Sequence, residues 1–544
     1  MAHNAEIGKD ILEMLMFSLY PEAETIYREY LQNASDSINE ASAMGILESR
    51  EDGHVTINID KYHSRVTISD NGTGIKATEA EQRLKDIAKT SKKDKKYLAG
   101  FYGIGRLVGA GYCKKLTFKT SYQGESVASE MIFDVEQIRS ILEDDENEMS
   151  ATTVIDSVTT FSNTTPEKPE EHYFNVVLED ILPEYPVLLD ETAINNYLCQ
   201  VAPISYSAVF KNNLVKPYLT QDDEKYLDYY NDLNMVQVSL NNIVDIRKQY
   251  STTIDGTGDE ISKLRFFSLT DSKYGDLAWG WYAITEFNTA IPDNDPNTGA
   301  PVLTRGMRLR VHNIQIGNQN FFDGTNYFRQ ARSNKYFNGE IHVLNNKIKP
   351  TTDRSDLAPS QEALALKKLI NEFFNSEMQK VYQTANKVKK EFERFMQAEQ
   401  EHAEVSTKKT TDDFPEQSRA AKLAEAVQKK NKAEEEMSKF QQKKDTVSQG
   451  VKDMLEVYQK KLDKFKEDVE NGVLTYNHTV VENDTKPTVK PTIDEEISNL
   501  EAKYGPDGTR MLKKIFSILD TRYKNKYEQI IKSIKSSIIN DLKK

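Results

Sequence analysis

Three short groups of residues in the first fifth of the chain carry side chains suited to phosphate chemistry. In the segment from Glu24 to Ala43, a helix would place Glu29, Asn33 and Asp36 on one face, because they stand at positions i, i+4 and i+7. Asn33 offers a neutral oxygen ligand to Mg²⁺, and Glu29 could take a proton from an attacking water. For this segment alone, a solvated polar helix face is the simpler alternative.

The second group follows a strand that ends at Asp70. Val66, Ile68 and Asp70 alternate onto one side of that strand, so Asp70 is a carboxylate at the edge of an apolar face. A carboxylate in that position needs a specific donor, such as an exocyclic amine or a trapped water. Gly72 and Gly74 permit positive φ and let the backbone approach a ligand closely. A hairpin end with an Asp-capped turn is the alternative.

The third group is a G-x-x-G-x-G sequence formed by Gly100, Gly103 and Gly105. Residues 106–110 after it can begin a helix, and the free N–H groups of such a loop suit phosphate oxygens. A single glycine triplet is a weak signal. The ordered set of three groups within one small domain predicts one nucleotide pocket.

Periodic segments surround these groups. Apolar residues recur at helical spacing from Ile26 to Ala41, and the ranges His54 to Asp60 and Arg65 to Asp70 alternate as strands. Leu116 to Thr120 and Ser126 to Val135 read as further strands. The polar stretch Lys76 to Ala99 lies between two glycine motifs, which favours a lid that closes over the nucleotide, with a solvated surface as the alternative.

The order of these motifs resembles the GHKL ATPases, the superfamily of gyrase, heat-shock protein 90, MutL, MORC proteins and histidine kinases. Glu29 to Asp36 is similar to the first motif of heat-shock protein 90, and Ile87 to Ser91 is similar to the segment that leads into its lid. The resemblance implies a Bergerat-type α/β sandwich that binds ATP and Mg²⁺. The motifs cover about residues 24 to 160.

The resemblance also implies roles for single residues. Glu29 would be the general base, Asn33 the Mg²⁺ ligand and Asp70 the acceptor for the adenine amine. The remaining nucleotide-binding positions implied are Asp36, Gly72, Gly74, Lys89, Gly100, Gly103, Ile104, Gly105 and Thr152. Thr152 stands for a Gly-Thr motif whose glycine is absent here. Arg106 departs from the aromatic residue usual in that chaperone.

Length and composition bound the remaining possibilities. The 544 residues are enough for several domains, and the net charge of −14 argues against a globally basic nucleic-acid binder. Cys113 and Cys199 are too few for a disulfide scaffold or a cysteine-rich zinc module. No P-loop signature is present. The chain shows neither a cleavable leader nor a run of about 18 apolar residues, so we expect a soluble cytoplasmic protein without membrane insertion.

We predict an α+β chain of five parts. They are an ATP-binding domain (1–184), a middle or transducer-like α/β domain (185–358), a helical coiled-coil region (359–470), a linker (471–492) and a C-terminal helical module (493–544). A near-heptad apolar spacing from Ala433 to Val469, broken at Lys444, predicts a coiled coil within or between subunits. The apolar stripe from Met511 to Ile538 favours dimerisation, with a basic nucleic-acid or membrane contact as the alternative.

The middle domain of GHKL clamps typically supplies a cation to the γ-phosphate, which would stabilise charge in the transition state. Arg332, in a polar run, is the preferred candidate. The other candidates are Arg305, Arg308, Arg310, Arg329 and Lys347. Each of them is a surface cation on the simpler interpretation.

Two functions fit these features. One is a homodimeric, ATP-driven clamp similar to heat-shock protein 90 that acts on protein clients. The other is a DNA-clamping ATPase similar to MORC or MutL proteins, which the coiled coil favours and the acidic composition does not. A histidine kinase is a third class, which we do not expect because the ATPase motifs begin near Glu29 and leave no room upstream for a sensor and a phosphoacceptor helix. A fourth possibility is a nucleotide-binding switch that does not hydrolyse ATP.

Overall fold

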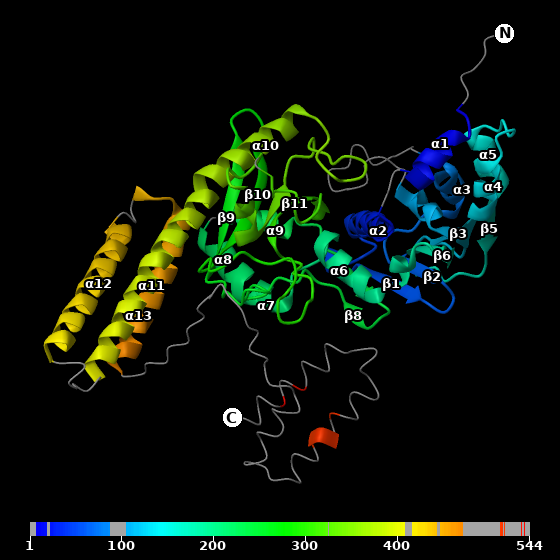
Figure 1. The fold of residues 1–544 in the computed structure, drawn as a ribbon. Coiled ribbons are helices and arrows are strands. Elements are labelled where there is room, and N and C mark those ends of the chain that lie inside the picture. Colours follow the sequence, from blue (N-terminus) through cyan, green and yellow to red (C-terminus); the bar gives the residue numbers. More distant parts are fainter. Residues whose placement is uncertain are drawn as a thin grey trace. The chain divides into compact units, whose positions relative to one another are not determined.

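The structure is a computed structural model that describes residues 7–18, 22–87, 105–222, 224–324, 326–407, 416–442 and 446–471, together with residues 512–514, 516, 535 and 538 (Figure 1). The chain forms two compact units, one of residues 1–296 with 300–464, the other of residues 297–299 with 465–544. Residues 88–99 of the predicted lid (76–99), the linker after residue 471 and most of the C-terminal module lie outside the described residues.

An eight-stranded sheet in the order β5-β4-β3-β6-β2-β1-β7-β8 organises the first half of the chain. Its strands are β1 (His54–Asp60), β2 (Arg65–Asp70), β3 (Cys113–Ser121), β4 (Ala128–Asp134), β5 (Thr159–Thr164), β6 (Tyr173–Ile181), β7 (Gln237–Leu240) and β8 (Val244–Asp245). Neighbours pair antiparallel except β1 with β7, which is parallel. The bounds of β1 and β2 confirm the alternation read from the sequence.

Helix α2 (Thr25–Ala43) packs its apolar side on this sheet, with Ile26, Leu31 and Ile38 fully buried. The other helical elements of this half are α1 (Asp10–Glu13), η1 (Met14–Ser18), η2 (Arg50–Asp52), α3 (Ala77–Lys85), η3 (Gly105–Gly111), α4 (Val135–Glu143), α5 (Ala151–Val158), η4 (Pro186–Leu189) and α6 (Glu191–Val201). Leu12 and Met16 belong to the same core, so the N-terminal segment closes its own domain.

The two halves of the chain are interleaved around residues 202–250. β7 and β8 lie in the range predicted for the middle domain, yet they extend the first sheet. The first hydrophobic core continues to Ile246, whereas the second core already begins at Tyr206. The first sheet therefore extends past residue 184, because β7 and β8 join it after the first helices of the second half of the chain.

The second half corresponds to the predicted middle domain and is called the middle half below. It contains a five-stranded sheet in the order β12-β11-β13-β10-β9. Its strands are β9 (Lys263–Asp271), β10 (Gly275–Ile284), β11 (Gly306–Val311), β12 (Ile314–Ile316) and β13 (Asn338–Val343). The helical elements around it are α7 (Ala208–Phe210), η5 (Lys211–Val215), α8 (Lys216–Asp222), α9 (Glu224–Asn231), η6 (Ala331–Tyr336) and α10 (Gln361–Phe373). Neighbouring residues of β9 face opposite sides: Phe266 contacts Tyr226 of α9, and Phe267 stacks on Phe373 of α10.

A buried ion cluster joins the middle sheet to the segment that crosses between the halves. Glu340 of β13 accepts hydrogen bonds from Arg310 Nε (2.6 Å), Lys248 Nζ (2.8 Å) and Tyr206 Oη (2.6 Å). Burial opposes ionisation of Glu340, but the charges of Arg310 and Lys248 hold its pKa well below the ordinary value. Buried charges persist only when paired, so the cluster fixes these segments to one another.

The C-terminal helices of the described chain are η7 (Phe374–Met378), α11 (Gln379–Thr407), α12 (Glu416–Gln442) and α13 (Gln449–Glu470). α11 and α12 lie side by side as a hairpin (Figure 1), with Lys429 Nζ 3.0 Å from Glu401 Oε2. The predicted heptad run from residue 433 to 469 is divided, because α12 ends at Gln442 and α13 begins at Gln449. Within the described chain, no helix combines the length and apolar character needed to span a membrane.

Lys248 gives the cluster a testable pH dependence. Burial lowers the pKa of Lys248 from 10.5 to about 7, with Arg310 acting in the same direction and Glu340 against it. Between these values the unfolded chain binds a proton that the folded chain has released, so the free energy of unfolding rises with pH. We expect wild-type protein to gain more stability than Lys248→Met between pH 6.5 and 9, measured by urea unfolding. Parallel stability profiles for the two proteins would contradict the buried position of this ammonium group.

Candidate functional site

The loop after β2 is held in one conformation by its neighbours. Gly72 N donates to Asp70 Oδ1 (2.9 Å), and Thr73 N donates to Ser37 Oγ of α2 (3.0 Å). A Cβ atom on Gly72 would lie 2.1 Å from Ser37 Oγ, so a side chain does not fit there. Gly74 has φ of +63°, and a Cβ atom on it would lie 1.8 Å from the carbonyl oxygen of Ser121. Both glycines are therefore required by the structure.

The first and third motifs also meet on α2. A Cβ atom on Gly105 would lie 2.9 Å from Glu29 Oε2, so the described end of the glycine loop approaches the carboxylate directly. Tyr30 Oη donates to the carbonyl oxygen of Arg106 (2.9 Å) and accepts from Gly109 N (3.0 Å). Residues from all three predicted motifs thus gather around one helix.

Glu29 lies buried between two guanidinium groups. Its Oε1 is 3.5 Å from Arg28 Nε and 3.5 Å from Arg354 Nε, and within the described part of the chain it accepts no hydrogen bond. Arg354 also donates to Gln32 of α2, and Arg28 Nη2 donates to the carbonyl oxygen of Asp353 (3.1 Å). A loop of the middle half therefore contacts the helix that carries the predicted general base.

Two further α2 positions complete its polar face. Asn33 is half-buried one turn after Glu29, and Asp36 is fully buried one turn further on. Asn33 supplies the neutral oxygen that suits Mg²⁺. Glu29 has one oxygen, Oε1, that accepts no hydrogen bond within the described residues, and the other, Oε2, faces Gly105.

The structure separates Thr152 and Arg332 from this group. Thr152 is exposed in α5, where its hydroxyl is 2.9 Å from Ser150 Oγ, and α5 leads into the edge strand β5. Arg332 is exposed in η6. The cation that reaches Glu29 from the middle half is instead Arg354, because its loop between β13 and α10 lies against α2. The predicted residues Lys89, Gly100, Gly103 and Ile104 lie outside the described residues.

Four of the other five candidate cations have a partner within the middle half. Arg305 Nε is 2.9 Å from Asp293 Oδ1, and Arg308 Nη2 donates to the carbonyl oxygen of Leu303 (3.0 Å). Arg310 belongs to the Glu340 cluster. Lys347 is exposed and lies 3.5 Å from Glu362, and Arg329 is exposed.

Residues without a sequence signal support the Asp70 loop. Ile75 N donates to Thr120 Oγ1 (2.9 Å), which donates in turn to the carbonyl oxygen of Tyr173 (2.9 Å). His172 Nδ1 lies 2.8 Å from the carbonyl oxygen of Gly72. Thr120 lies in β3 and His172 directly precedes β6, so only the sheet order brings these side chains to the loop.

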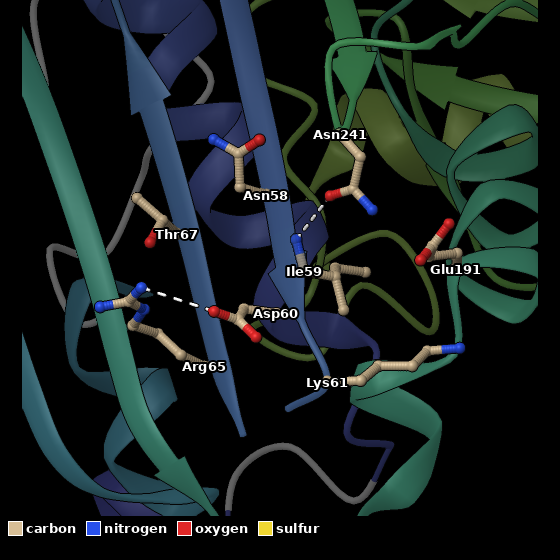
Figure 2. Close-up of a pocket in the computed structure, with 8 residues that line it drawn as sticks. All are labelled: Asn58, Ile59, Asp60, Lys61, Arg65, Thr67, Glu191 and Asn241. Atoms are coloured by element: carbon tan, nitrogen blue, oxygen red, sulfur yellow. Dashed lines mark hydrogen bonds and ion pairs between the residues drawn. The ribbon is translucent and has the colours of Figure 1, made fainter. Parts of the chain in front are cut away.

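A separate polar pocket lies on the opposite face of the same strands (Figure 2). Asn58, Asp60, Arg65 and Thr67 point into it, from positions that alternate with the buried residues of β1 and β2. Arg65 Nη2 is 3.6 Å from Asp60 Oδ2. Because Asp70 belongs to the buried set, this pocket is distinct from the predicted nucleotide site.

Comparison with known proteins defines the class of the first domain. A family model described as "Histidine kinase-, DNA gyrase B-, and HSP90-like ATPase" matches residues 22–165. That range contains α2, the Asp70 loop and the glycine motif, which are the elements gathered in the site. This part of the chain is therefore similar to GHKL-type ATPase domains, including that of heat-shock protein 90.

The curated relatives include several proteins named chaperone protein HtpG. The one from Buchnera aphidicola subsp. Baizongia pistaciae is 30% identical over 132 residues, which is 21% of this chain and 21% of the relative. The one from Acinetobacter baylyi is 31% identical over 136 residues, 22% of this chain and 21% of the relative. The chain thus spans about a fifth of the length of the curated relatives it matches.

Gly74 offers a test of the loop geometry. We expect Gly74→Ala to weaken ATP binding at least about 10-fold, because the new Cβ collides with a backbone oxygen and the loop must move. Titration calorimetry with a non-hydrolysable ATP analogue measures the affinity. The matched control is Gly124→Ala, since Gly124 also has positive φ (+90°) but has no atom within 4 Å of a Cβ. Equal affinity in both variants would contradict a nucleotide at this loop.

Proposed function

We propose that the protein is an ATP-dependent conformational clamp that hydrolyses Mg-ATP, similar to a heat-shock protein 90-type chaperone. The observation that carries the proposal is the position of Glu29, a buried carboxylate with one oxygen that accepts no hydrogen bond within the described chain, beside Gly105 and Arg354. A general base needs such a lone pair within reach of a water.

The proposed reaction divides its tasks between the two halves of the chain. Glu29 takes a proton from a water, the water oxygen bonds to the γ-phosphorus, and the bond to the bridging oxygen of ADP breaks. Asp70 accepts a hydrogen bond from the adenine amine, and the fixed Gly72–Gly74 backbone shapes the adenine site. Asn33 would hold Mg²⁺, which when bound would neutralise charge on the phosphates.

Arg354 takes the role that the sequence led us to expect of Arg332. It lies 3.5 Å from Glu29 and comes from the other half of the chain, so it can stabilise phosphate charge only when the two halves are in contact. This dependence would couple hydrolysis to a change in their relative position, which is what a clamp requires.

Phosphate release by purified protein tests these roles. We expect Glu29→Gln and Arg354→Ala each to lower kcat about 10²-fold or more with nearly unchanged ATP affinity, and Asp70→Asn to lose binding instead. Arg332→Ala is the comparison variant for Arg354→Ala. A loss in Arg332→Ala without one in Arg354→Ala would return the cation role to Arg332, and full activity of Glu29→Gln would exclude Glu29 as the base.

The partner of the clamp is tested by the same assay. We propose a cytoplasmic homodimer that acts on protein clients, as the similarity to HtpG chaperones suggests, and the net charge of −14 supports a partner other than DNA. Phosphate release is measured with duplex DNA at low and raised salt, and with a reduced, unfolded model protein. DNA stimulation that falls steeply with salt would favour the MORC- or MutL-like alternative.

A further inference from the structure

The turn between β11 and β12 has an uncommon backbone. Val311 pairs with Ile314, which leaves His312 and Asn313 as a two-residue loop with φ of +51° and +62°. Positive φ at both central residues defines the turn type that matches the twist of a hairpin, but a histidine adopts it much less readily than glycine. Such a conformation persists only where the surroundings enforce it, and it often marks a functional position.

Asn313 ties this turn to the segment that crosses between the halves of the chain. Its Oδ1 accepts from Lys248 Nζ (2.7 Å), and its Nδ2 donates to the carbonyl oxygen of Asn234 (2.8 Å). Its own carbonyl oxygen accepts from Arg310 Nη1 (3.1 Å). Lys248 and Arg310 both bond to the buried carboxylate of Glu340, so the turn is anchored on the buried ion cluster of the middle half.

The other side of the same hairpin holds the loop of Arg354. Gly317, the residue after β12, donates its N–H to the carbonyl oxygen of Arg354 (2.8 Å). Burial lowers the pKa of His312, the charge of Asp36 opposes this shift and the charge of Arg354 adds to it. The turn therefore lies within electrostatic range of α2 as well as of Arg354.

We propose that Asn313 is a positioning residue for the hydrolysis inferred above: it anchors the β11–β12 hairpin, and the hairpin holds Arg354 against Glu29. The inference rests on the proposed function. The hairpin connects the two sites by a short path, from Lys248 through Asn313 and the three residues of β12 to Gly317 and Arg354. A displacement of about 1 Å at a reacting group can lower a rate up to about 10²-fold. Loss of the Asn313 hydrogen bonds would let Arg354 shift relative to Glu29 and so lower the rate of hydrolysis.

The test removes the side chain and keeps the backbone. Asn313→Gly suits the positive φ but deletes the bonds to Lys248 and Asn234, and we expect kcat to fall about 10-fold with unchanged ATP affinity. In the Arg354→Ala background the same substitution should lower kcat no further, because Asn313 acts on the reaction only through the Arg354 side chain. Asn242→Gly is the matched control, because Asn242 also has positive φ (+54°) in an exposed turn.

A second measurement does not depend on turnover. Hydrogen exchange of the ATP-free protein should show faster exchange of the Gly317 amide in Asn313→Gly and unchanged protection of β10 in the same sheet. Lys248→Met removes the same bond from its other partner and should give the same result, which keeps the test available if Asn313→Gly does not fold.

The outcomes separate the two claims. Unchanged exchange at Gly317, or effects of Asn313→Gly and Arg354→Ala that simply add, would overturn the positioning role. If wild-type protein releases no phosphate, the proposed function fails, and the exchange measurement alone then decides whether Asn313 fixes the Arg354 loop.

Discussion

The arrangement of the two halves depends on the buried carboxylate of Glu29, whose negative charge must be compensated by positive charge nearby. Glu29 projects from the polar side of a helix whose other side is the core of the first domain, so it cannot turn to solvent. A buried charge is tolerated only beside opposite charge. One compensating group, Arg28, precedes it in the chain, and the other, Arg354, arrives from the middle half. Compensation of one charge thus links the two halves.

Helix α2 is the element on which the remaining contacts converge. Its apolar residues fix it to the sheet, Tyr30 fixes the start of η3, and Ser37 fixes the loop after β2. The loops that would surround a nucleotide are therefore positioned by side chains of one rigid element. Such pre-organisation favours binding, because little ordering is left to occur when the ligand arrives.

Strong local periodicity made part of this architecture predictable from the sequence. The alternation in β1 and β2 and the helical spacing in α2 gave their positions directly, and the three motifs pointed to one site. β6 was missed because the apolar residues of Tyr173–Ile181 stand next to one another in the sequence, although their burial in the sheet alternates between Val176 and Leu178. Arg354 carried no signal, since it is a single cation in a polar loop and its partners lie more than 300 residues earlier. The β11–β12 turn contains no glycine, so the sequence does not mark it as a turn.

The parallel pairing of β1 with β7 has a consequence for dividing the protein. A fragment that ends near residue 184 would lose β7 and β8, and β1 would become an open edge with unpaired backbone groups over residues His54–Ile57. Exposed edges of this kind template aggregation between molecules. A fragment that keeps this edge paired should therefore continue through Asp245, and it would carry with it the helices of residues 208–231, which belong to the neighbouring core.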